Sequence, residues 1–137
     1  MNDIIEDLKV DEGFRSKPYI CTAGANTVGY GRNLDALGIS EEEAEHMLRN
    51  DVARVEHELD KAYPWWIKCP GSVRRAMTNM VFNLGINRFG GFKRMLACLQ
   101  AGDYRGASVA ALDSKWADQV GDRALRIAAQ IAEAKGD

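Results

Sequence analysis

Residues 11–31 have the sequence DEGFRSKPYICTAGANTVGYG, and the hydrophobic period changes as the chain enters this stretch. Just before it, an apolar helical stripe begins at Asp3 as a candidate N-cap and stops at Gly13. Within it, two strand-like segments, residues 19–21 and 27–30, flank a loop that contains glycine. The stretch therefore predicts a short first helix followed by a β-hairpin.

Two features of the hairpin predict how it is built. Pro18 lacks a backbone N–H, so the first strand is expected at the edge of its sheet. Gly29 and Gly31 stand inside the second strand, where glycine indicates a tight bend or a close approach to another group. We therefore expect either curvature here or another part of the molecule lying against the strand.

A long helix is predicted next, from Ser40 to a stop at Tyr63-Pro64. Ser40-Glu41-Glu42-Glu43 has the form of a capping box. Apolar residues then recur at helical intervals: Ala44, Met47, Leu48, Val52, Val55 and Leu59. A helix over residues 40–62 would be about 34 Å long, which suits a connection between two lobes.

The rest of the chain is predicted to be helical. One apolar helix face ends at Gly85 and a second at Gly102, and two more helices are expected with Asp103 and Asp122 as N-caps. The apolar positions are Val73, Ala76, Met77, Met80, Val81 and Leu84, then Phe92, Met95, Leu96 and Leu99, then Ala107, Ala110 and Leu112, and finally Leu125, Ile127, Ala128 and Ile131. We expect this helical cluster to carry most of the core.

Length and composition are those of one folded globular domain. The 137 residues are 46% hydrophobic and 28% charged, which excludes a disordered chain. No run of about 18 uncharged apolar residues is present to span a bilayer, and residues 1–9 lack the basic start and apolar stretch of a secretory signal. We therefore expect no stable association with a membrane.

Charge is distributed unevenly along the chain. Residues 1–60 carry 14 acids and 6 bases, whereas residues 61–137 carry 6 acids and 12 bases, so their net charges are −8 and +6. The basic half could meet a polyanion, either nucleic acid or an anionic wall polymer. An ordinary mixed surface explains it equally well.

The cysteines and histidines predict no metal site and no cofactor. Cys21, Cys69 and Cys98 form no CxxC pair, which argues against a disulfide framework and a zinc site and fits a reducing compartment. His46 and His57 would lie about 16 Å apart on the predicted long helix, too far to share one metal ion.

Three polar side chains would meet if the first helix and the hairpin pack together. Glu12 ends the helix, Cys21 closes the first strand and Thr27 opens the second. From spacing alone a purely structural interpretation is favoured, with an exposed glutamate, a small buried cysteine and a β-favouring threonine.

A resemblance to a known family changes that interpretation. Eight residues separate Glu12 from Cys21 and five separate Cys21 from Thr27, which Val28-Gly29-Tyr30-Gly31 follows. This pattern resembles the Glu-x8-Asp/Cys-x5-Thr signature of phage-type lysozymes, the muramidase endolysins of tailed phages. Further segments resemble the linking helix and C-terminal lobe of the same family, in order: residues 40–52, Val73-Arg74-Arg75-Ala76, residues 79–85, Gly91-Phe92, Trp116 and Arg123-Ala124.

The resemblance, which covers nearly the whole chain, implies the fold. We expect an α+β, mainly α, lysozyme-like fold in a single domain of residues 1–137. A small hairpin lobe would occupy residues 13–39 and a connecting helix residues 40–62. Residues 1–12 and 63–137 would form the helical lobe, with the cleft between the lobes.

The resemblance also implies roles for site residues. Glu12 would be the general acid that protonates the glycosidic oxygen, a role that needs a carboxyl group protonated near neutral pH and therefore desolvated. Arg123 would hold Glu12 through an ion pair rather than activate it, because an adjacent cation lowers a carboxyl pKa. Asn33, Phe82 and Asn83 match positions near the substrate, although Phe82 could be a core residue and Asn83 could satisfy backbone groups.

Cys21 stands where aspartate is commoner in that family. Aspartate is ionised at pH 7, whereas a thiol is mostly neutral unless a cation lowers its pKa. Either the thiolate is locally favoured, or catalysis depends on Glu12 and on Thr27, whose hydroxyl would position the attacking water. Because a thiolate is also a nucleophile, a water-mediated route and a covalent, retaining route both stay open.

The implied function is hydrolysis of the β-1,4 bond between N-acetylmuramic acid and N-acetylglucosamine in peptidoglycan, for host lysis. We expect a monomer that binds peptidoglycan and no nucleic acid. It would accumulate in the host cytoplasm and reach the wall once another phage protein permeabilises the membrane. The alternatives are a catalytically silent peptidoglycan-binding module, a lytic transglycosylase that leaves an anhydro sugar, and a helical nucleic-acid binder.

Overall fold

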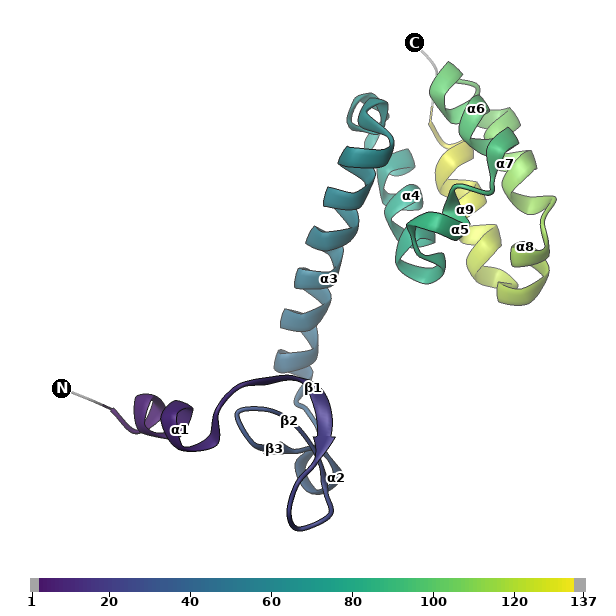
Figure 1. Cartoon of the computed structure of the whole chain (residues 1–137). Coiled ribbons are helices and arrows are strands. Elements are labelled where there is room, and N and C mark those ends of the chain that lie inside the picture. The colour runs from purple at the N-terminus through teal and green to yellow at the C-terminus, as the bar shows by residue number, and fades with distance from the viewer. Residues whose placement is uncertain (1–2, 135–137) are drawn as a thin grey trace. The chain divides into compact units, whose positions relative to one another are not determined.

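The computed structural model describes residues 3–134, and contacts divide the chain into two compact units (Figure 1). The first unit is Met1–Met47 and the second is Leu48–Asp137, so the boundary falls inside the long helix α3 (Glu41–Ala62). Many helices and one small antiparallel sheet confirm the predicted α+β, mainly α class. Residues 1–12 belong to the first unit by their contacts, and their predicted packing with the helical lobe stays a prediction.

The first unit begins with the predicted short helix, α1 (Ile4–Glu12). The Asp3 side chain accepts a hydrogen bond from the Glu6 backbone N–H at 2.9 Å, and the helix ends at Gly13. Both predicted ends are therefore confirmed. The apolar stripe of α1 is exposed, because none of the residues of this helix is buried.

The hairpin is confirmed and carries a third strand. β1 (Arg15–Ile20), β2 (Asn26–Gly29) and β3 (Arg32–Asn33) form an antiparallel sheet in the order β1-β2-β3, so β1 is an edge strand, as Pro18 predicts. Thr27 in the central strand pairs with Tyr19 on one side and Asn33 on the other. Two residues are too few to show a period, which is why the sequence did not predict β3.

The sheet connects to the long helix through a single helical turn, α2 (Leu34–Leu37). Asp35 in this turn accepts hydrogen bonds from the backbone and side chain of Asn26, and these bonds lower the pKa of its carboxyl group. The predicted capping box of α3 is confirmed: Glu43 N–H donates to Ser40 Oγ at 3.1 Å, and Ser40 N–H donates to Glu43 Oε1 at 2.8 Å. The start of α3 is thereby fixed within the first unit.

The second unit is a helical cluster (Figure 1). After α3 come a 3₁₀ helix, η1 (Pro64–Lys68), and the helices α4 (Gly71–Leu84), α5 (Ile86–Phe89), α6 (Lys93–Ala101), α7 (Tyr104–Leu112), α8 (Lys115–Val120) and α9 (Asp122–Ala132). Helix α7 packs against α6 and α9, and α9 also packs against α4. The core lies here, as predicted, and includes Val55, Leu59, Met77, Met80, Phe89, Leu99, Ile127 and Ile131.

Several predictions about this unit need correction. Asp122 is the first residue of α9 rather than its N-cap, a position that Gly121 takes. Helix α8, capped by Ser114, and the short elements η1 and α5 were not predicted, because elements of four to six residues show too little periodicity. Met47, Leu48, Leu112 and Leu125, which were assigned to apolar helix faces, are exposed. Among residues 3–134, no helix has both the length and the apolar character that crossing a membrane requires.

Candidate active site

Glu12 lies against the strand region of the sheet. A Cβ atom built on Gly31 would be 2.9 Å from Glu12 Oε2 and 3.2 Å from its Cδ, so the carboxylate occupies the space that any other residue at position 31 would need. The backbone of Gly31 has φ +81°, which also favours glycine. The predicted close approach at Gly31 is confirmed, and Glu12 is the group that makes it. The placement of Gly31 inside the second strand is wrong, because β2 ends at Gly29 and Gly31 lies in the turn before β3.

The environment of Glu12 differs from the one expected of a general acid. Its side chain is exposed, whereas the expected role calls for a desolvated carboxyl group. Its contact with Gly31 leaves the Glu12 side chain exposed to water. The expected desolvation of Glu12 stays a prediction.

Cys21 and Thr27 are brought together, as the sequence predicted. The Ala25 carbonyl accepts the Cys21 backbone N–H at 2.9 Å and the Thr27 hydroxyl at 2.9 Å, which fixes the loop between β1 and β2. The Thr27 side chain is also within hydrogen-bonding reach of the Cys21 thiol. Thr27 is buried, with 3% of its surface exposed, so the partly exposed Cys21 is the more accessible of the two.

The loop also stabilises negative charge on sulfur. Hydrogen bonds from the Ala25 backbone, the Thr27 hydroxyl and the Ala23 backbone lower the pKa of the Cys21 thiol. We expected a cation to be needed for such a shift, whereas here the donors are N–H and O–H groups. Within residues 3–134 no three His, Cys, Asp or Glu residues are grouped as a metal site.

Asn33 has a structural task in the same unit. Its Oδ1 accepts the Ala36 backbone N–H at 3.0 Å and so caps α2. Asn33 also pairs with Thr27 in the sheet. Its predicted contact with substrate stays a prediction.

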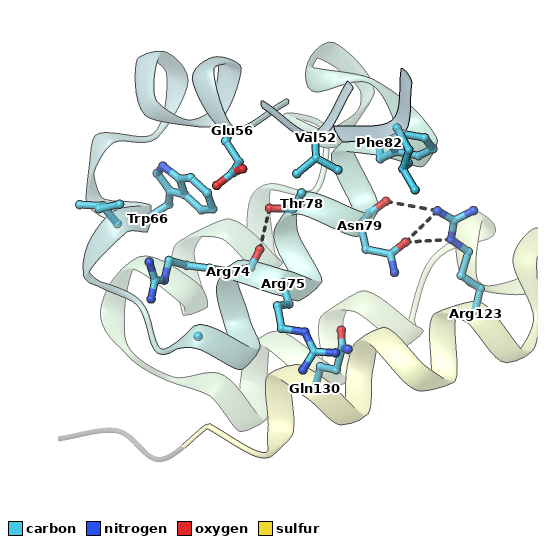
Figure 2. Close-up of a pocket in the computed structure, with 13 residues that line it drawn as sticks. Val52, Glu56, Trp66, Arg74, Arg75, Thr78, Asn79, Phe82, Arg123 and Gln130 are labelled. Carbon is cyan, nitrogen blue, oxygen red and sulfur yellow. Dashed lines mark hydrogen bonds between the residues drawn. The ribbon is translucent and has the colours of Figure 1, made fainter. Parts of the chain in front are cut away.

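Two of the three predicted residues of the second unit line a pocket of about 690 Å³ (Figure 2). Phe82, with 44% of its surface exposed, and Arg123 line it. The other lining residues are Leu48, Val52, Glu56, Trp66, Ile67, Gly71, Arg74, Arg75, Thr78, Asn79 and Gln130. The sequence analysis did not single out Trp66 or Thr78, because apolar and hydroxyl residues at helical spacing carry no signal of a pocket.

Arg123 is held by Asn79. Figure 2 shows the Arg123 guanidinium of α9 directed at Asn79 of α4, with Nη2 donating to Oδ1 at 2.7 Å and Nε donating to the same oxygen at 3.0 Å. Nη2 also lies 3.4 Å from the Asn79 carbonyl oxygen. Asn79 therefore orients Arg123, and the expected ion pair of Arg123 with Glu12 stays a prediction, because these residues belong to different units.

Asn83 is engaged elsewhere. Its Oδ1 accepts the indole N–H of Trp116 at 2.8 Å. Trp116 is 3% exposed, so this bond satisfies a buried donor. Although they are neighbours in sequence, Phe82 lines the pocket whereas Asn83 bonds to Trp116. Substrate binding by Asn83 stays a prediction.

Comparisons with known proteins agree with this architecture. The model of the family described as "Phage lysozyme" matches residues 9–129. An endolysin of Acyrthosiphon pisum secondary endosymbiont phage 1 is 40% identical over 107 residues, which cover 74% of this chain and 69% of that protein. The pre-baseplate central spike protein Gp5 of Enterobacteria phage T4 is 29% identical over 150 residues, which cover 89% of this chain and 26% of the spike protein.

Proposed function

The chain belongs to the phage lysozyme family, and from this premise we propose that it hydrolyses the β-1,4 bond between N-acetylmuramic acid and N-acetylglucosamine in peptidoglycan. The observation that supports the proposal is the approach of the Glu12 carboxylate to Gly31, beside the sheet that bears Thr27. A carboxyl group that is already positioned can protonate the leaving oxygen without first changing its own conformation.

In the proposed reaction, Glu12 donates its proton to the glycosidic oxygen while the bond from that oxygen to the anomeric carbon breaks. The departing sugar leaves as a neutral alcohol rather than an alkoxide. Positive charge develops on the anomeric carbon, and a water molecule attacks it. Substrate bound over the first unit would exclude water from the exposed Glu12 side chain.

In this proposal Cys21 is the general base. A thiolate, which the loop donors favour, accepts a proton from the attacking water as its oxygen bonds to the anomeric carbon. Thr27 is buried and acts on that water through Cys21 rather than by direct contact. Its hydroxyl has one hydrogen, which serves the Ala25 carbonyl in the neutral site and can turn toward sulfur when the thiol ionises.

The remaining predicted residues support binding in this proposal. Phe82 offers an exposed ring and Asn33 an amide to the glycan, and Asn83 contributes through the placement of Trp116. Arg123, oriented by Asn79, would pair with Glu12. The protein would act on the cell wall as a monomer, after release from the host cytoplasm.

Product analysis on purified cell-wall sacculi in ¹⁸O-water tests the proposal. We expect soluble muropeptides whose new reducing ends carry one ¹⁸O atom. Glu12→Gln should reduce the rate about 100-fold or more, since general acid catalysis contributes about 10²–10⁴-fold. The matched control is Glu6→Gln, which makes the same chemical change on an exposed residue of α1.

Other outcomes would reject the assignment in distinct ways. Absence of soluble products with wild-type protein that still sediments with sacculi would identify a silent binding module. Anhydro sugars without ¹⁸O would identify a lytic transglycosylase. Equal rates for Glu12→Gln and Glu6→Gln would remove Glu12 from the reaction.

A further inference from the structure

The second unit has another pocket, of about 500 Å³, whose residues the proposed reaction does not use as reacting groups. It is lined by residues from the end of α4, the corner between α5 and α6, and the corner between α7 and α8. Four cationic side chains line it: Arg88, Lys93, Arg94 and Lys115. The only carboxylate among its lining residues is Asp113.

Most of this positive charge is uncompensated. Arg94 Nη2 lies 3.6 Å from Asp113 Oδ2, but the two side chains are 68% and 76% exposed, so their attraction is weak. Within the described part of the chain, Arg88, Lys93 and Lys115 have no carboxylate partner. The pocket is therefore a place where an anion would be attracted.

The backbone adds to this attraction. Helix α6 begins at Lys93, beside the pocket, and no side chain caps its N-terminus because Phe92 stands at the N-cap position. Helix N-termini present free N–H groups and a partial positive charge, which suit a phosphate group. Lys93 and Arg94, which line the pocket, belong to this first turn and add positive charge to it.

One wall of the pocket is apolar and firmly held. The rings of Phe92 and Trp116 meet edge to face, with centroids 5.9 Å apart and planes at 86°. The Trp116 indole is fixed by its hydrogen bond to Asn83 at 2.8 Å. Leu84 and Met95 extend this wall. A ligand that matches the pocket therefore combines an anionic group with a less polar body.

We propose that this pocket binds a phosphorylated sugar, with the phosphate among the cations and the ring of the sugar against the apolar wall. An arginine guanidinium can donate two parallel hydrogen bonds to phosphate oxygens, and the free N–H groups of a helix N-terminus can donate to them as well. The cell envelope as the source of that sugar rests on the proposed function, whereas the chemistry of the pocket does not.

Nucleic acid fits the same charges less well. Binding of single strands uses several exposed aromatic rings on which successive bases stack. Of the two rings that line this pocket, Trp116 is buried and only Phe92 is partly exposed, which is enough for one sugar ring but not for a run of bases.

Titration of the full chain with N-acetylglucosamine 6-phosphate, followed by amide NMR shifts and calorimetry, tests the proposal without any turnover. We expect shifts at Lys93, Arg94 and Met95, and an affinity about tenfold higher than for N-acetylglucosamine or inorganic phosphate alone. The double variant Arg88→Gln/Lys93→Gln should lose about tenfold in affinity, equivalent to about 1.4 kcal/mol. The control Arg105→Gln/Arg126→Gln removes two exposed arginines outside the pocket and should bind as wild type does.

Each other result would overturn the proposal. Equal affinity for inorganic phosphate and the sugar phosphate would mean that the apolar wall takes no part. Tighter binding of a single-stranded oligonucleotide at the same amides would identify a nucleic-acid surface. Shifts spread over the unit, or equal losses in the two double variants, would leave only non-specific charge attraction. By contrast, intact binding in Glu12→Gln together with loss of hydrolysis would support the proposal, because the pocket would then work apart from the reaction.

Discussion

Arg32 and Glu43 form a two-pronged ion pair that joins β3 to the first turn of α3. Arg32 Nη1 donates to Glu43 Oε1 at 2.9 Å, Nη2 donates to the other carboxylate oxygen, and Nη1 also donates to the Gly38 carbonyl at 3.0 Å. Glu43 is at the same time the acidic residue of the capping box. One carboxylate thus closes the helix N-terminus and ties the sheet to it.

The first prediction concerns acid stability. Arg32 and the Ser40 N–H hold the pKa of Glu43 at about 2, below the ordinary 4.5. A depressed carboxyl pKa stabilises the folded state above about pH 4.5, and this stabilisation is lost as the pH falls toward 2. Glu43→Gln should therefore lower the thermal midpoint of unfolding at pH 7. The difference in midpoint between this variant and wild type should shrink as the pH falls from about 4.5 to about 2.

The control for this experiment is Glu42→Gln, an exposed neighbour in the same first turn of α3. Its thermal midpoint should stay close to that of wild type at every pH. If Glu43→Gln lowers the thermal midpoint by the same amount at pH 7 and at pH 2.5, the loss of the ion pair is not the cause.

The second prediction uses two glycines of the strand region. Gly31→Ala and Gly29→Ala both place alanine at a positive φ, +81° and +70°, and each should cost about 1–2 kcal/mol of stability. Only Gly31→Ala introduces a Cβ into the space of the Glu12 carboxylate. Activity on sacculi should fall about 100-fold in Gly31→Ala and much less in Gly29→Ala. Similar activities in the two variants would contradict the placement of Glu12 as the critical feature.

The third prediction concerns Cys21. If its thiolate accepts the water proton, activity rises as the pH passes through the thiol pKa, which the loop donors lower from 9.0. Cys21→Asp should remain active with its pH optimum moved to lower pH, because a carboxyl group ionises at lower pH. Cys21→Ala should lose about 100-fold. Rates across pH 4–9 measure both effects, with Cys98→Ser as the thiol control.

Thiol alkylation provides an independent check of the same role. Iodoacetamide should inactivate the wild type and Cys98→Ser, and it should leave Cys21→Asp active. Full activity in Cys21→Ala would instead mean that catalysis depends on Glu12 and Thr27 alone.

The fourth prediction separates a structural from a substrate-binding role for Asn83. Asn83→Ala leaves the buried Trp116 N–H without its acceptor, which should cost about 1–3 kcal/mol. Urea unfolding followed by tryptophan fluorescence measures this loss. Asn87→Ala, at an exposed position on the neighbouring α5, should be neutral. Unchanged stability together with a raised KM would favour direct binding of substrate.

Periodicity and caps predicted the larger elements because these signals are local. Asp3 and Gly13 bound α1, and Ser40 and Glu43 cap α3, through bonds between residues three or four apart. Elements of two to six residues, such as β3 and α8, escaped prediction because they are shorter than the windows in which a period can be seen.

For the candidate site, the sequence spacing predicted that Cys21 and Thr27 lie at facing ends of a hairpin, and Gly31 indicated a close approach of another group. The sequence could not identify Glu12 as that group. The side-chain partners of Arg32, Arg123 and Trp116 lie 11 to 44 residues away in sequence, so no local pattern encodes them.

By itself the sequence determined the order of the elements, the two sides of the hairpin and the family signature, because each follows from residues close together along the chain. Only the tertiary structure decided that Glu12 lies over Gly31, that Asn79 holds Arg123, and that Asn83 serves Trp116. The physical reason is that a hydrogen bond or a steric contact depends on distance in space. Packing brings together side chains whose separation along the chain carries no information about their contact.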